Sequence, residues 1–233
     1  MDRISGYIIE TIAQNELIHL EEVSLHGSRT NPSSVDRWSD IDVKIVLQEG
    51  QEVDRKFIEA LLKNIGTLIG KQTLIGEKEI VCRVVLRTHL TSDIEMIDFT
   101  LAKNLRGKRV IECKADLKDQ EEQVFWFRLF LSAIKWMRED HLIGTHLLLN
   151  NLQMLLEMEM RKRDERKKTN IHRFGDGENV KELLALAQLQ WKKKSQIANY
   201  LCAIGEQYDR MMLERNATYE PKNDHLRAYL TNC

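Results

Sequence analysis

Hydrophobic positions in the first half of the chain follow two different spacings. Segments that alternate or are rich in β-branched residues indicate strands at residues 23–26, 40–47, 80–86 and 94–101. Apolar residues at helical spacing indicate a helix over residues 4–12 and another over residues 57–65, with Gly66 as its stop. Helices interleaved with strands predict a sheet domain with flanking helices over residues 1–116.

The second half of the chain has a different pattern. After residue 117 the strand signal ends, and apolar stripes at helical spacing cover residues 124–134, 148–158, 180–189 and 197–213. Pro32 and Pro221 are the only prolines, so no proline interrupts these helices. We therefore expect an α+β protein, with the sheet domain followed by a C-terminal helical bundle over residues 117–233.

Charge and cysteine content narrow the possible partners. The net charge is −1 at pH 7, so no global field draws the chain to nucleic acid. No stretch approaches the roughly 20 apolar residues of a membrane helix, and the acidic start does not resemble a signal peptide. The four cysteines are scattered, without a metal-type pair. We expect a cytoplasmic protein that has no membrane partner and no disulfide.

Candidate chemistry is concentrated where the second predicted strand begins. Gly27 ends one strand, and Ser28 follows with a hydroxyl and a backbone N–H that suit a phosphate oxygen. After eleven intervening residues come Asp40 and Asp42. Period two on a strand places both carboxylates on one face, with Ile41 turned toward the core. Because two close carboxylates repel each other, this pair suits a magnesium ion that carries a nucleotide.

A third carboxylate is available on a later strand. In residues 96–100, Ile97 and Phe99 are expected to face the core and to leave Asp98 on the polar side. An adjacent strand would bring Asp98 beside the other two aspartates. Three carboxylates can hold magnesium ions for displacement at phosphorus, and Asp98 could also accept the proton of an attacking hydroxyl.

These motifs resemble those of a known group of enzymes. The Gly-Ser element followed by Asp-x-Asp resembles the signature of the polymerase β-like nucleotidyltransferase superfamily. Gly27–Pro32, Trp38–Asp42 and Ile97–Leu101 are similar to segments of the streptomycin (aminoglycoside) 6-adenylyltransferases. Phe125–Trp126 and Arg138–Asp140 resemble the same group and, more loosely, the lincosamide nucleotidyltransferases. The resemblance implies a mixed β-sheet with flanking helices, then a helical domain that helps to bind the acceptor.

The resemblance also implies a reaction: AMP passes from ATP to a hydroxyl of a small molecule, and pyrophosphate leaves. Beside the three aspartates, we expect the nucleotide to be bound by Gly27, Ser28, Arg29 and Lys44. Arg29 could instead pair with a carboxylate, and Lys44 could form a structural ion pair. Asp140 could bind an amino group of the acceptor or could simply be an exposed acid at a helix end.

Two other functions stay open. The acceptor could be a protein or an RNA end, as in antitoxin-type nucleotidyltransferases, although the charge and the large helical half disfavour it. Alternatively, the chain could be a non-catalytic nucleotide-binding module, which the presence of all three carboxylates disfavours. An aminoglycoside-like acceptor is the leading interpretation, with a lincosamide as its variant.

Overall fold

The computed structural model describes residues 2–16, 18–30, 35–48, 51, 53–76, 79–103, 119–168, 183, 185–186 and 194–231. Contacts divide the chain into two compact units, Met1–Phe127 and Arg128–Cys233. This division falls inside helix α3 (Glu121–Met137), later than the boundary expected between residues 116 and 117.

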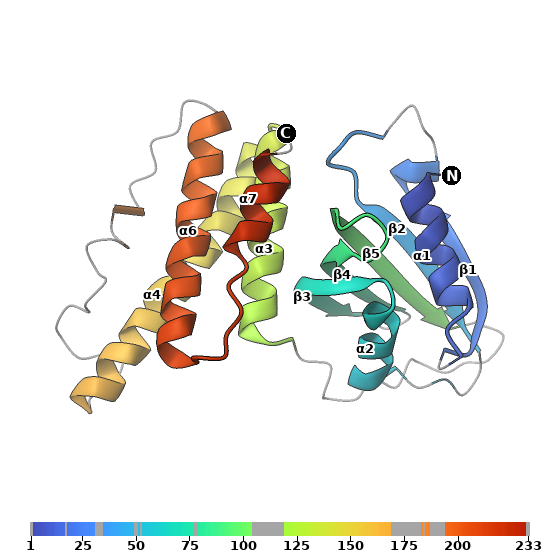
Figure 1. Ribbon diagram of the computed structural model, residues 1–233, viewed down its shortest axis with the longest axis horizontal. Helices are drawn as coiled ribbons and strands as arrows, with labels where there is room; N and C mark the ends of the chain where they lie inside the picture. The colour runs from blue at the N-terminus through green and yellow to red at the C-terminus, as the bar shows by residue number, and fades with distance from the viewer. Residues whose placement is uncertain are drawn as a thin grey trace. The chain divides into compact units, whose positions relative to one another are not determined.

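The first unit is built on one mixed sheet (Figure 1). Its strands are β1 (Leu20–His26), β2 (Ile41–Leu47), β3 (Gly66–Ile75), β4 (Glu79–Thr88) and β5 (Ile94–Lys103). They lie in the order β1-β2-β5-β4-β3. β2 and β5 are parallel, and every other neighbouring pair is antiparallel. The expected α+β class and the mixed sheet are confirmed.

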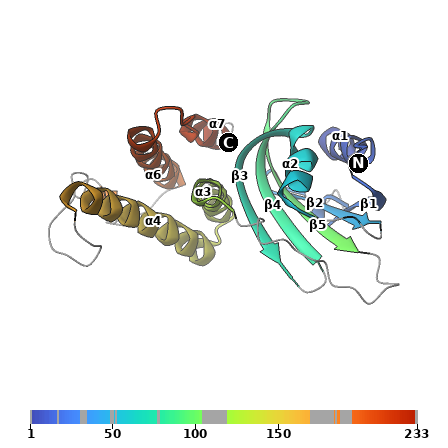
Figure 2. The ribbon, with the colours of Figure 1, turned by 90° about the horizontal axis from the view of Figure 1, so that it is seen from below.

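Two helices cover one face of this sheet, α1 (Arg3–Ala13) and α2 (Arg55–Lys63) (Figure 2). Each begins at an aspartate that caps its first turn: Asp2 accepts a hydrogen bond from the backbone N–H of Ser5, and Asp54 from that of Phe57. The alternate residues Ile41, Val43, Ile45 and Leu47 of β2 turn toward these helices and are fully buried. The intervening side chains of β2 therefore lie on the opposite face.

β3 was not predicted from the sequence. Gly66, expected to end a helix, begins this strand instead, and α2 ends earlier, at Lys63. Two glycines and several polar residues obscure the alternation of the segment, and the pairing with β4 shifts between Leu68 and Gly70. The second glycine has a packing role, because a Cβ on Gly70 would lie 2.4 Å from the backbone nitrogen of Phe127.

The described helices of the second half are α3, α4 (His141–Lys167), α6 (Lys194–Arg215) and α7 (Asn223–Thr231). Three of the four expected helical stripes are confirmed, and the one over residues 180–189 lies mostly outside the described residues. α7 was not predicted, because it is short and follows Pro221 closely. None of the helices in the described ranges is both long and apolar enough to cross a membrane.

Candidate active site

The three predicted aspartates come together at one end of β2 and β5. The parallel register of these strands sets Asp42 directly beside Asp98. β2 begins at Ile41, one residue later than expected, so Asp40 lies just before the strand. Each of the three side chains offers a carboxylate oxygen, and these oxygens all lie within 4.8 Å of one another. Ile97 and Phe99 are fully buried, as the sequence predicted.

Burial makes ionisation of Asp98 and Asp42 costly. The side chain of Asp98 is only 13% exposed. Burial raises the pKa of Asp98 to about 6, and Asp40 and Asp42 add to the effect by repulsion, while Arg83 opposes it. The pKa of Asp42 is also raised, first by burial and then by the charge of Asp40. Oδ1 of Asp98 is buried and has no hydrogen-bond partner among the described residues.

Gly27 lies directly against this cluster. Its φ is +65°, a conformation that glycine adopts without strain. A Cβ added to Gly27 would lie 1.9 Å from Oδ2 of Asp42. Any side chain at position 27 would therefore meet the carboxylate of Asp42 first.

Arg29 connects three segments of the first unit through its guanidinium group. Its guanidinium forms ion pairs with Glu95 at 3.1 Å and Asp2 at 3.4 Å, and it donates to the backbone oxygen of Ser39 at 3.0 Å. These contacts join the turn after Gly27 to the residue that precedes Asp40. Of the two roles considered for Arg29, the structure shows pairing with carboxylates, and the phosphate contact stays a prediction.

Two other predicted nucleotide ligands lie close by in the chain. Ser28 begins a short 3-10 helix, Ser28–Thr30, whose last residue donates to the carbonyl oxygen of Gly27 through both its backbone N–H and its hydroxyl. Lys44 follows Asp42 by two residues on β2, so both side chains point away from the fully buried core face. Contacts of Ser28 and Lys44 with a nucleotide stay predictions.

The sequence analysis missed Arg83. This residue lies opposite Asp98 in the antiparallel pairing of β4 with β5, and its Nε donates to Oδ2 of Asp98 at 2.8 Å. A signal was present in the strand pattern. Ile80, Cys82 and Val84 are fully buried in the core, so the alternation places Arg83 on the polar face.

Asp140 belongs to the second unit, where it caps α4. Its side chain accepts from the backbone N–H of Ile143 at 3.3 Å and lies 3.7 Å from Nζ of Lys135. Asp140 therefore lies at a helix end, as the second interpretation expected, but it also caps that end; binding of an acceptor by Asp140 stays a prediction.

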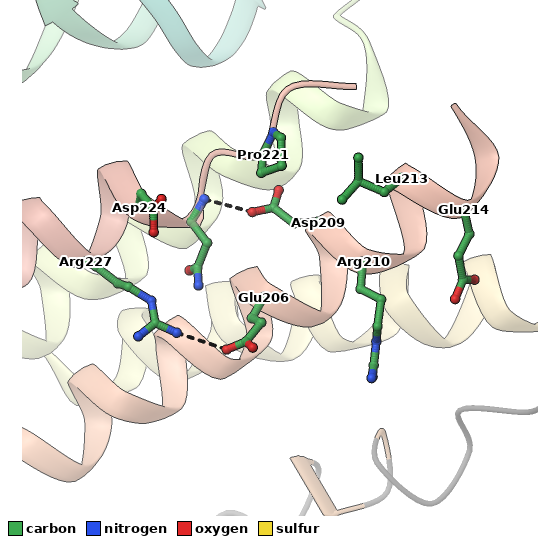
Figure 3. A pocket seen from close by; sticks show the side chains of 9 residues that line it. Glu206, Asp209, Arg210, Leu213, Glu214, Pro221, Asp224 and Arg227 are labelled. Atoms are coloured by element: carbon green, nitrogen blue, oxygen red, sulfur yellow. Dashed lines mark hydrogen bonds and ion pairs between the residues drawn. The ribbon is translucent and has the colours of Figure 1, made fainter. Parts of the chain in front are cut away.

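The second unit also contains a pocket of about 660 Å³ between α6 and α7 (Figure 3). Several of its polar side chains have partners within the protein. Arg227 pairs with Glu206 at 2.9 Å, and Asp209 accepts from the backbone N–H groups of Lys222 and Asn223. The buried hydroxyl of Tyr219 also donates to Asp209 at 2.7 Å. These bonds fix the start of α7 against α6, which is a structural role.

No protein-family model matches this chain, and a search of curated proteins found no match either. The chemistry of the site must therefore be inferred from its side chains. Three converging carboxylates beside a glycine turn can hold a divalent cation and accept a proton.

Proposed function

We propose that this protein is a magnesium-dependent nucleotidyltransferase. It transfers a nucleoside monophosphate, AMP from ATP by the resemblance, to a hydroxyl of a small aminoglycoside-like molecule and releases pyrophosphate. The observation that carries the proposal is the convergence of Asp40, Asp42 and Asp98 within 4.8 Å. Asp40 and Asp42 at the start of β2 meet Asp98 of β5 at one point, and a bound cation would relieve their mutual repulsion.

The residues present fit a magnesium ion. All three side chains offer oxygen, the ligand that magnesium prefers. Oδ1 of Asp98 is buried without a hydrogen-bond partner in the described part of the chain, so it retains a lone pair for a cation. When bound, magnesium would supply charge neutralisation for the phosphates of the nucleotide and for the pyrophosphate that leaves.

The side chains of the site have distinct roles in this proposal. Asp40 and Asp42 hold the cation, with Oδ1 of Asp98 as a further ligand. Asp98 accepts the proton of the attacking hydroxyl, a contribution of about 10²- to 10⁴-fold to the rate. Gly27 and Ser28 offer backbone N–H groups and a hydroxyl to a phosphate oxygen. Catalysis rests mainly on positioning and on charge, as is general for phosphoryl and nucleotidyl transfer.

A small-molecule acceptor is favoured over a nucleic acid by charge. With a net charge of −1, the chain has no general attraction for a phosphate backbone. Convergence of all three carboxylates also favours an enzyme over a passive nucleotide-binding module, because binding alone does not require a third buried acid. A lincosamide is the second candidate acceptor, on the basis of the looser resemblance.

The proposal is tested by incubating the protein with magnesium, labelled ATP and a panel of aminoglycosides and lincosamides, followed by mass spectrometry. We expect a drug that gains one nucleoside monophosphate. Asp42→Asn should abolish the product, whereas Asp93→Asn, at an exposed position just before β5, should leave it unchanged. Failure of the wild-type protein to bind magnesium–ATP would refute the proposal, and label found on RNA or on a protein would reassign the acceptor.

A further inference from the structure

Arg83 is held in a fixed orientation beside the carboxylate cluster. Its side chain is 26% exposed, and Nε donates to Oδ2 of Asp98 at 2.8 Å. The guanidinium carbon also lies over the ring of Phe127, 5.5 Å from its centroid. An ion pair on one edge and an aromatic ring against one face together restrict the rotation of a planar guanidinium.

The remaining donors of Arg83 are uncommitted within the described residues. The contact with Asp98 uses Nε, and neither terminal nitrogen donates to a described acceptor. These terminal groups offer four of the five N–H donors of an arginine. Arg83 on β4 is paired with Asp98 on β5, and Asp98 is paired with Asp42 on β2, so these donors belong to a residue next to the carboxylate cluster.

Arg29, the arginine that the sequence suggested for phosphate binding, differs in this respect. Its guanidinium already binds two carboxylates and a backbone oxygen, and its side chain is only 11% exposed. Arg83 is the more exposed of the two and also the one that contacts the cluster.

We propose that Arg83 binds a phosphate of the nucleoside triphosphate through its terminal nitrogens while Nε positions Asp98. This inference rests on the proposed function and adds a residue to it. A planar fork of N–H donors matches two oxygens of a phosphate, and an orientation fixed in advance reduces the entropy lost on binding. Positive charge beside the acids also offsets their repulsion of the polyphosphate.

The two roles of Arg83 can be separated by a double-mutant cycle. If Arg83 acts only by holding Asp98, then Arg83→Gln has no effect once Asp98 is replaced by asparagine. If Arg83 also contacts phosphate, the loss persists in the Asp98→Asn background. The readout is the affinity for inorganic tripolyphosphate with magnesium, measured by calorimetry, which requires neither acceptor nor turnover.

Arg83→Gln should weaken binding of tripolyphosphate and of ATP by about tenfold or more, in both backgrounds, since charge-assisted hydrogen bonds are lost. Arg83→Lys keeps the charge but lacks the fork, so its loss should be smaller. Arg87→Gln is the matched control, because Arg87 lies on the same strand and the same side, is exposed, and is four residues away. It should bind like the wild type.

Circular dichroism shows whether Arg83→Gln folds. If it does not, Arg83→Met takes its place, because methionine keeps an apolar stem against Phe127. Unchanged affinity in either folded variant overturns the proposal, and so does a loss that disappears in the Asp98→Asn background. A wild-type protein that binds no magnesium–tripolyphosphate would overturn the proposed function together with this inference. If the wild-type protein binds magnesium–tripolyphosphate and substitution of Arg83 does not change the affinity, only this inference is overturned.

Discussion

Gly27 is the residue where backbone conformation and site geometry depend on each other most directly. Gly27→Ala must place a Cβ where the carboxylate of Asp42 lies, at a φ of +65°. The positive φ alone costs an alanine about 1–2 kcal/mol. We expect the free energy of unfolding to fall by at least about this much, and the magnesium affinity to fall about tenfold or more because Asp42 is displaced. Urea denaturation and calorimetry measure the two effects.

Backbone strain and displacement of Asp42 can be distinguished at this position. Asparagine adopts positive φ more readily than alanine, so Gly27→Asn should lose less stability. It carries the same Cβ, however, and should lose as much magnesium affinity. Normal magnesium binding by both folded variants would show that the contact between Gly27 and Asp42 does not matter for the site.

The pKa of Asp98 predicts how cation binding depends on pH. Its value of about 6 in the folded protein lies above the ordinary 3.8, so the folded state binds this proton more tightly than the unfolded state. Protonation of Asp98 therefore stabilises the fold at low pH, and this contribution is lost as the pH rises through about 6. A cation binds the carboxylate form, so its affinity changes in the opposite direction and increases with pH.

Magnesium should accordingly raise the melting temperature more at about pH 7.5 than at about pH 5, where proton competition lowers its affinity about tenfold. Thermal melting with and without magnesium at both values measures this. In Asp98→Asn, the magnesium-induced rise in melting temperature should be nearly the same at both pH values. An equal magnesium effect at both pH values in the wild type would contradict the placement of Asp98 in the cation site.

Capping and acceptor binding by Asp140 predict different outcomes for two substitutions. Asparagine caps helices about as well as aspartate, so Asp140→Asn should change the free energy of unfolding by less than about 0.5 kcal/mol, whereas Asp140→Ala should cost about 1 kcal/mol. Equal losses for both would contradict the capping role seen in the structure. An increase in the acceptor KM for Asp140→Asn, without a loss of stability, would support the predicted acceptor contact.

At the scale of elements, period-two alternation was enough to predict the strands that carry Asp42 and Asp98. The pattern around Asp42 and Asp98 predicted which side chains face the core, and the parallel register then brought the two carboxylates together. The same pattern could not predict β3, because Gly66 and Gly70 interrupt the alternation. Both positions lie so close to neighbouring backbone atoms that a side chain would not fit. The pattern also could not pair Arg83 with Asp98, since strand order is a tertiary property.

Asp119, just before α3, is joined to β3 by a buried ion pair. Nζ of Lys71 lies 3.1 Å from Oδ1 of Asp119, with side chains 10% and 9% exposed, and the hydroxyl of Thr73 donates to the same carboxylate. Asp119→Ala leaves Lys71 buried without this partner, so it should cost about 3–5 kcal/mol.

An exposed pair on α2 provides the comparison. Arg55 and Glu59 lie 2.7 Å apart, but their side chains are 55% and 59% exposed. Glu59→Ala should therefore cost less than about 1 kcal/mol. Urea denaturation of both variants tests the contrast. A loss for Asp119→Ala as small as that for Glu59→Ala would show that the buried pair does not stabilise the contact between β3 and the start of α3.

At the scale of the whole molecule, the carboxylates, Gly27 and Arg83 all belong to the unit Met1–Phe127. The sequence could predict that the carboxylates lie together because a few short motifs carry them. It could not identify the acceptor, because specificity depends on side chains that tertiary structure brings together. If the proposed nucleotide site lies within this one unit, substitutions there should lower transfer to every acceptor alike, as measured by turnover with each acceptor of the panel.

The side chains near the carboxylates bear on whether the reaction proceeds by one displacement or two. A double displacement needs a nucleophilic side chain at the site, and Cys82 cannot serve, because it is fully buried on the core face and burial raises its pKa to about 12. His26, which neighbours Asp42 in the register of β1 and β2, is the residue to exclude. We expect direct attack of the acceptor hydroxyl on the α-phosphorus, without a covalent intermediate.

Two measurements decide between the mechanisms. With an α-phosphorothioate nucleotide of known handedness, a single displacement inverts the configuration at phosphorus, whereas two displacements retain it. Mass spectrometry of the protein after incubation with magnesium–ATP alone should find no added nucleotide, and His26→Gln should leave the configuration of the product unchanged.

Asp98→Asn should keep much of the nucleotide affinity while it slows transfer by about 10²- to 10⁴-fold. A parallel loss of affinity would instead make Asp98 chiefly a cation ligand, and net retention would require a nucleotidylated enzyme.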